Sequence, residues 1–195
     1  MITALEMKAL EDGSGIPPQT LMERAGKAFV EELKKQHEVK GKKILVACYH
    51  GRNAGDGFVI ADALAEEAEV EVLFMGDEEK MSKETAHFFK EVNDNSLVQF
   101  VSLDTVDTDE YDILIDAILG INIHNYLKPE ITIAIKQLNE AKGKRIAVDI
   151  PTGVHPDSGA IIGEAFNADL IITFHDMKPG LEQFKEKVVV VGIGL

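Results

Sequence analysis

The spacing of hydrophobic and polar positions changes along the chain, and each change marks an expected element. Apolar residues recur every three or four positions over 21–33, which predicts an amphipathic helix with Thr20 as its N-cap. Short apolar runs follow, which are typical of strands buried on both faces of a sheet. These strands are expected at 43–48, 70–75, 97–103, 111–119, 145–150, 168–174 and 188–191.

Helical patterns alternate with these strands. Helices are predicted at about 57–67, at 82–92 with Ser82 as the cap, and at 129–141 with Pro129 in the first turn. Such alternation implies right-handed crossovers, so the fold class is α/β with a doubly wound, mostly parallel sheet. The length of 195 residues predicts one domain spanning 1–195.

Charge and cysteine content narrow the classes of partner. The chain has 20 Lys and Arg against 34 Asp and Glu, a net charge of −14, which opposes nucleic-acid backbones and anionic membranes. Cys48 is the single cysteine, so no internal disulfide is expected. Glu6 and Glu11 stand where a signal peptide needs an apolar run. These features predict a cytoplasmic protein without nucleic-acid or membrane partners.

Three of the predicted strands end in polar segments that contain glycine, at 49–57, 116–120 and 149–153. Open parallel sheets bind ligands beyond the carboxyl ends of their strands. The first segment leads into a helix and would present backbone N–H groups to a phosphate. It lacks the spacing of GxGxxG and of the Walker A loop. An alternative is that its glycines only turn the chain and Asp56 caps the helix.

Oxygen-bearing side chains stand at the same strand ends. Asp116 and Asp149 end consecutive strands, so their carboxylates can face one crevice, and Asn53 and Thr152 add an amide and a hydroxyl. These hard donors suit an alkali or alkaline-earth cation better than zinc. The alternative is that each aspartate caps its own turn.

Five segments in this order resemble the YjeF N-terminal domain family, the NAD(P)H-hydrate epimerases. They are LMERAG at 21–26, GRNAGDG at 51–57, DAILG at 116–120, DIPTG at 149–153, and Ala168-Asp169-Leu170 with Lys178, Gly180 and Leu181. The resemblance implies a Rossmann-like three-layer α/β/α sandwich, often dimeric, so a homodimer is expected. The sequence departs from the motifs at Tyr49-His50, at Arg52 and Ala54, and over 121–124.

The resemblance also implies an activity. The expected reaction interconverts the R and S forms of hydrated NADH or NADPH, a step of nicotinamide nucleotide repair, and an NAD(P)H-hydrate dehydratase is the expected functional partner. The rival is a non-catalytic nucleotide-binding or scaffolding relative of the same fold. Such a scaffold would not need Asn53, Asp56, Asp116 and Asp149, which this chain retains.

Residue roles carried over from the family are expectations of the same kind. A potassium ion is expected between Asn53, Asp116 and Thr152, a set whose single formal charge suits a monovalent cation. Asp149 is the first choice for proton transfer and Asp56 the second. Arg52, which departs from the family motif, is expected from its own charge to bind a phosphate. The full substrate-binding set is Arg52, Asn53, Ala54, Gly55, Asp56, Gly120, Ile121, Asn122, Ile123, His124, Asn125, Tyr126 and Asp149.

Overall fold

The computed structural model describes residues 1–122 and 126–195, and within them seven strands form one sheet whose neighbours are all parallel. The strands are β1 (Lys43–Cys48), β2 (Glu69–Phe74), β3 (Val98–Val101), β4 (Ile113–Ala117), β5 (Lys144–Val148), β6 (Leu170–Phe174) and β7 (Val188–Val191). Their order is β3-β2-β1-β4-β5-β6-β7. The order reverses between β1 and β4, the switch point at which doubly wound folds bind ligands.

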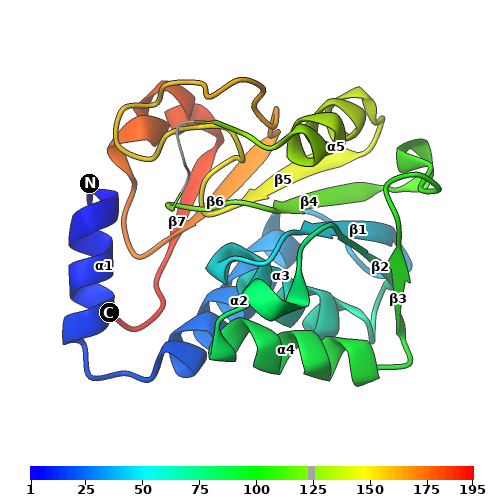
Figure 1. Ribbon diagram of the computed structural model, residues 1–195, viewed down its shortest axis with the longest axis horizontal. Coiled ribbons are helices and arrows are strands. Elements are labelled where there is room, and N and C mark those ends of the chain that lie inside the picture. The colour runs from blue at the N-terminus through cyan, green and yellow to red at the C-terminus, as the bar shows by residue number, and fades with distance from the viewer. Residues whose placement is uncertain (123–125) are drawn as a thin grey trace.

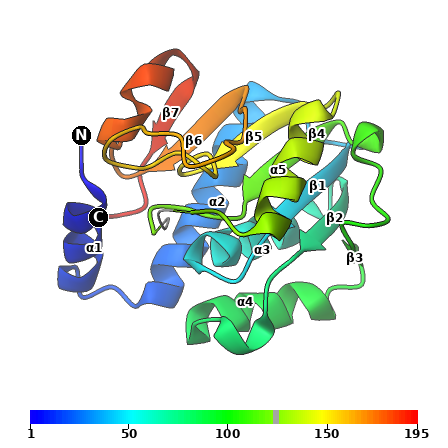
Figure 2. The same ribbon diagram turned by 45° about the horizontal axis from the view of Figure 1, so that its top comes forward.

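Helices cover both faces of this sheet, which confirms the predicted α/β/α sandwich. They are α1 (Ala4–Gly13), α2 (Pro18–Gln36), α3 (Arg52–Leu64), α4 (Lys83–Asp94) and α5 (Pro129–Glu140), with 3₁₀ segments η1 (Glu78–Lys80), η2 (Thr108–Glu110) and η3 (Pro179–Lys187). Figure 1 and Figure 2 show α2, α3 and α4 on one face and α5 on the other. None of the helices in the described ranges is long and apolar enough to cross a membrane.

Burial along β1 explains why its sequence is an unbroken apolar run. Ile44 and Val46 pack in the cluster beneath α2 and α3, whereas Leu45 and Ala47 pack in the cluster beneath α5. All four side chains are fully buried. A strand covered on both faces needs apolar residues at every position, because successive side chains point to opposite faces.

The glycine-rich segment after β1 is helical, which corrects the prediction that α3 starts near residue 57. The helix begins at Arg52, with Gly51 as its N-cap, so Asp56 lies inside the helix and does not cap it. Glycine is a poor helix former, but tertiary packing overrides this preference here. A Cβ at Gly57 would lie 2.6 Å from Ala117 Cβ, so only glycine lets α3 approach β4 this closely.

The helix starts were predicted with mixed success. Ser82 caps α4 as expected, because its hydroxyl accepts a hydrogen bond from the Thr85 N–H at 3.2 Å. The prediction for Thr20 is wrong: α2 begins at Pro18, whose ring already fits the first helical position, and Thr20 lies in the first turn. The helix α1 was not predicted, although Thr3 and Glu6 form a complete capping box at its start.

Candidate functional site

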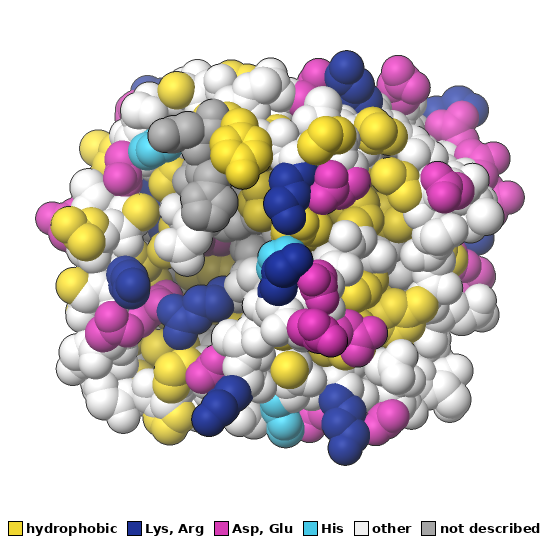
Figure 3. All heavy atoms as spheres, viewed as in Figure 1, with side chains coloured by type: hydrophobic (Ala, Val, Ile, Leu, Met, Phe, Trp, Pro, Cys, Tyr) yellow, Lys and Arg dark blue, Asp and Glu magenta, His cyan; other side chains and the backbone are white. Residues whose placement is uncertain are grey.

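A cavity of about 280 Å³ lies at the carboxyl ends of the central strands, on the side of the sheet covered by α2 and α3. The segments that follow β1, β4 and β5 line it, and α1 closes one side. Figure 3 shows the surface hollowed on the left of the view, with basic side chains at the edge of the hollow. The cavity therefore lies where the strand order predicts a ligand site.

Asp149 occupies the end of β5 and is held by three donors. Its Oδ1 accepts hydrogen bonds from Lys178 Nζ at 2.5 Å, Thr173 Oγ1 at 2.8 Å and the Phe174 N–H at 3.2 Å. Lys178 is completely buried and also donates to Thr173 Oγ1 and to the Phe174 carbonyl. The Asp149 side chain is thus paired with a buried lysine and fixed in position at the cavity wall.

Asp56 faces the same cavity in an opposite environment. Asp56 is half-buried, and its carboxyl group receives no hydrogen bond from the described residues. Burial raises the pKa of Asp56 well above its ordinary value, and the carboxylates of Asp149 and Glu11 raise it further, against the opposing effect of Arg52. The pocket therefore holds one carboxylate bonded to a cation and one carboxyl group that favours its protonated form.

A cluster of oxygen donors lies beneath the pocket floor. Asp116 is fully buried, and it accepts hydrogen bonds from the Thr152 N–H and Oγ1, each at 2.7 Å, and from the Ile118 N–H at 3.2 Å. Burial raises the pKa of Asp116 to about 6, against the lowering effect of the Thr152 hydrogen bonds. The ionised form of this carboxylate lacks a counter-charge among these contacts.

Asn53 lies in the first turn of α3, against the segment that follows Asp116. It is buried against Gly120, where an added Cβ would lie 3.1 Å from Asn53 Oδ1. Its Nδ2 has no hydrogen-bond partner among the described residues. The orientation of a side-chain amide follows from its hydrogen bonds, so a rotated amide would place an oxygen where the unpartnered nitrogen stands. The donor set therefore fits a cation bound by Asn53, Asp116 and Thr152.

Arg52 is paired with a residue that the sequence did not suggest. Its Nη1 donates to Glu11 Oε2 of α1 at 3.0 Å. Burial raises the pKa of Glu11, and the charge of Arg52 opposes that rise. Both side chains line the cavity, so Arg52 is placed at the predicted ligand site but is bonded to a carboxylate.

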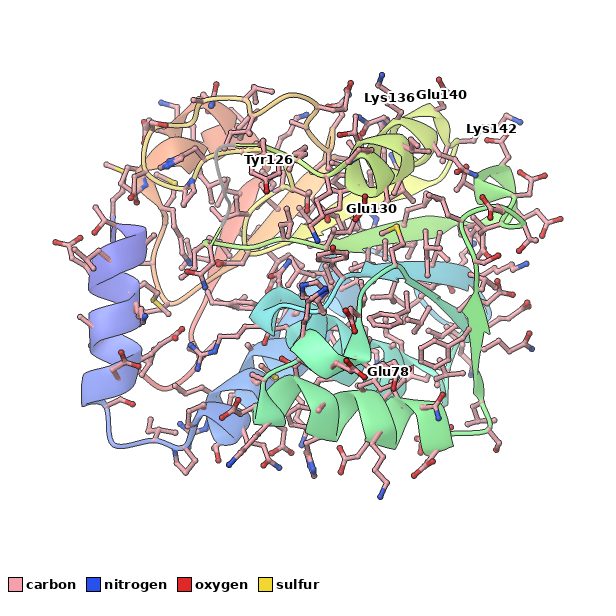
Figure 4. All side chains as sticks on the ribbon, in the orientation of Figure 1. Glu78, Tyr126, Glu130, Lys136, Glu140 and Lys142 are labelled. Carbon is pink, nitrogen blue, oxygen red and sulfur yellow. The ribbon has the colours of Figure 1, made fainter. Side chains whose placement is uncertain are left out.

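The structure brings together most of the predicted site. Seven of the proposed substrate-binding residues line the cavity: Arg52, Asn53, Asp56, Gly120, Ile121, Asn122 and Asp149. Ala54 and Gly55 are buried within α3, Gly55 against Met22, and neither lines the cavity. Tyr126 is exposed on the segment that leads into α5, above Glu130 in Figure 4. Ile123, His124 and Asn125 lie outside the described residues.

Two parts of the site were missed by sequence reasoning. The first is α1, which contributes Met7, Lys8 and Glu11 to the cavity; the spacing of Thr3 and Glu6 would have signalled this helix. The second is the pairing of Lys178 with Asp149, which lies 29 positions away in the sequence. No local pattern indicates a contact of that separation.

The fold and the site define a doubly wound α/β protein with an acidic pocket at its topological switch point. A model of the family described as YjeF-related protein N-terminus matches residues 18–180. The chain therefore belongs to the YjeF-related N-terminal family. This confirms the resemblance drawn from the five motifs.

Curated relatives and a solved structure agree with this placement. The chain is 37% identical to the bifunctional NAD(P)H-hydrate repair enzyme Nnr of Methanothermobacter thermautotrophicus, over 86% of this chain and 34% of that protein. It is 33% identical to an NAD(P)H-hydrate epimerase of Oenococcus oeni, over 93% of this chain and 88% of that protein, and 36% identical to one of Limosilactobacillus fermentum, over 92% and 88%. The crystal structure of yeast ynu0, YNL200c, superposes with a TM-score of 0.85 at 19% identity, over 98% of this chain and 87% of that one, which shows the shared fold.

The curated relatives form two groups, long bifunctional repair enzymes and shorter epimerases. The chain spans about a third of the bifunctional enzyme and most of each epimerase. The region common to both groups is thus the one whose pocket is described above.

Proposed function

We propose that this protein is an NAD(P)H-hydrate epimerase, an isomerase that interconverts the R and S forms of hydrated NADH or NADPH. The observation that carries the proposal is the pair of pocket carboxyl groups in opposite environments, Asp56 and Asp149. Titratable groups whose surroundings favour different protonation states are typical of acid–base sites. The relatives named epimerases, at 33% and 36% identity over nearly the whole chain, support the same substrate.

The chemistry requires a proton donor and a nearby negative charge. The hydrated ring carbon bears a hydroxyl group and is bonded to the ring nitrogen. When the hydroxyl is protonated, the nitrogen lone pair forms a C=N bond, the C–O bond breaks and water leaves. The product is an iminium cation, to which water adds from either face with loss of a proton. No electron is gained or lost overall.

The contacts of the two carboxyl groups support a division of these roles. Protonated Asp56 donates its proton to the leaving hydroxyl and, as a carboxylate, takes a proton from the water that adds. The Asp149 carboxylate, hydrogen-bonded to Lys178 and Thr173, stabilises the iminium cation by its charge. The sequence favoured Asp149 for proton transfer, whereas its three hydrogen bonds support the reverse assignment, which variants at the two positions can test.

A potassium ion is proposed as the cofactor. Asn53, Asp116 and Thr152 would hold it, and their single formal charge suits a monovalent ion. When bound, the ion would supply the counter-charge that buried Asp116 lacks. Asn53, Asp116 and Thr152 would then be held in place, which would keep the pocket in shape before the substrate arrives.

An NAD(P)H-hydrate dehydratase is the proposed functional partner, because the bifunctional repair enzymes combine a region like this chain with about twice its length of further sequence. Cys48 is fully buried and unpaired with any other cysteine of the chain, which supports the expected cytoplasmic location.

Epimerisation of an enriched substrate tests the function. Hydrated NADH enriched in the R form is mixed with the protein, and the two forms are separated by chromatography at short times. We expect the forms to equilibrate much faster than in buffer alone. Variants Asp56→Asn and Asp149→Asn should each slow the reaction. An unchanged rate in the presence of protein that binds the dinucleotide would instead support the rival, a non-catalytic nucleotide-binding relative.

A further inference from the structure

Helix α1 contributes one acidic side chain, Glu11, to the pocket lining. Glu11 lies in the last turn of α1, and its side chain is only 19% exposed, although Met7 is the single buried residue of this helix. Its Oε2 accepts the hydrogen bond from Arg52 Nη1. The family match begins at residue 18, so Glu11 lies outside it. The pair joins a peripheral helix to the first residue of α3.

Arg52 is one of only two basic side chains that line the cavity among the described residues. The other is Lys8, on a protein whose net charge is −14. A dinucleotide carries a negatively charged diphosphate. Lys8 and Arg52 are therefore the pocket side chains that can attract it by their charge. Without Glu11, the Arg52 guanidinium could instead pair with the carboxylate of Asp149, which lines the same cavity. Such a pair would draw Arg52 away from the ligand and neutralise a carboxylate that the proposed reaction uses.

We propose that Glu11 is a positioning residue that holds Arg52 where its guanidinium binds the diphosphate of the substrate. Arginine has five N–H donors, and the contact with Glu11 uses one of its terminal nitrogens. The rest of the guanidinium is available to phosphate oxygens. A side chain already ordered in the free protein loses less entropy on binding than a mobile one. This inference rests on the proposed dinucleotide substrate.

A double-mutant cycle with ADP-ribose tests the proposal. ADP-ribose carries the diphosphate but no hydrated nicotinamide ring, so its binding is measured by calorimetry without any turnover. Arg52→Asn should weaken binding roughly 10- to 100-fold, since it removes hydrogen bonds to a charged group. Glu11→Gln should weaken binding roughly three- to tenfold, and it should have no effect in the Arg52→Asn background. Asp12→Asn removes the same charge from the exposed next position of α1 and is expected to bind as the unsubstituted protein does.

Each other outcome would overturn the proposal. If Glu11→Gln weakens binding equally in both backgrounds, Glu11 acts through the packing of α1 and not through Arg52. If Glu11→Gln tightens binding, the carboxylate competes with the diphosphate for Arg52. If Arg52→Asn binds unchanged, Arg52 does not contact the ligand. Failure of the epimerase assay with these ADP-ribose results intact would refute the proposed reaction alone.

Discussion

Replacing Lys178 with methionine isolates the ion pair that fixes Asp149. The side chain of Lys178 is 0% exposed and that of Asp149 is 11% exposed, so water replaces little of what is lost. Methionine has a similar length but donates no hydrogen bond. The substitution therefore leaves the Asp149 carboxylate without its cation and the Phe174 carbonyl without the Lys178 donor.

The expected destabilisation is large for a single substitution. Removing one partner of a buried ion pair costs about 3–5 kcal/mol, because the other charge remains uncompensated. For a domain of this size each kcal/mol lowers Tm by about 2–4 °C, so Tm should fall by about 6–20 °C. Differential scanning calorimetry measures this change. Lys185→Met, the same substitution at a side chain that is 61% exposed, should alter stability by less than about 0.5 kcal/mol.

A second substitution separates loss of packing from loss of charge balance. Asp149→Asn in the Lys178→Met background removes the uncompensated carboxylate and keeps its shape. The double variant should be more stable than Lys178→Met alone, although both should be poor epimerases. A Tm of Lys178→Met within about 2 °C of that of the unsubstituted protein would correspond to no more than about 1 kcal/mol of unfolding free energy. That result would show that the Lys178–Asp149 ion pair does not form in solution.

Three further substitutions or conditions test other parts of the site. Asp56→Asn should reduce turnover by roughly 10²–10⁴-fold with an unchanged circular dichroism spectrum, and near-full turnover would contradict its role as proton donor. Potassium chloride should raise Tm by about 5–11 °C relative to choline chloride when potassium is at 100-fold excess over its Kd for the protein. Asp116→Asn should abolish that rise, and equal Tm values in the two salts would exclude the ion. Gly57→Ala should destabilise the protein by about 1–3 kcal/mol, because the new methyl group would lie 2.6 Å from Ala117 Cβ. The control is Gly192→Ala, whose methyl group would meet no atom within 4 Å. Equal unfolding midpoints in urea for these two variants would contradict the packing argument.

The fold was predictable because burial on both faces leaves a strong local signal. The run Lys43–Cys48 coincides with β1 residue for residue. The chain segments that follow β4 and β5 line one pocket as expected, although Asp116 itself does not line it. Parallel strands end at the same edge of a sheet, so their order did not have to be known. The sequence therefore predicted which strand ends surround the pocket without knowledge of its three-dimensional contacts.

The details around α3 were not predictable from local preference. Glycines at 51, 55 and 57 indicated a loop, since glycine disfavours helix. The reason for the helix lies in its neighbours: a Cβ at Gly55 would collide with Met22, and one at Gly57 with Ala117. Both contacts join segments far apart in the sequence. The same holds for Arg52, which meets Glu11 across 41 positions.

The backbone at the pocket supports the view that Asp149 is placed for function. Among the described residues, Asp149 and His175 are the non-glycine residues with positive φ, at 63° and 66°, and they directly follow β5 and β6. This conformation costs roughly 1–2 kcal/mol for an L-residue. At Asp149 it accompanies the hydrogen bonds from Thr173, the Phe174 N–H and Lys178. A strained turn, a buried lysine and an isolated carboxyl group at Asp56 each disfavour folding, and their meeting at one cavity is typical of a site selected for chemistry over stability.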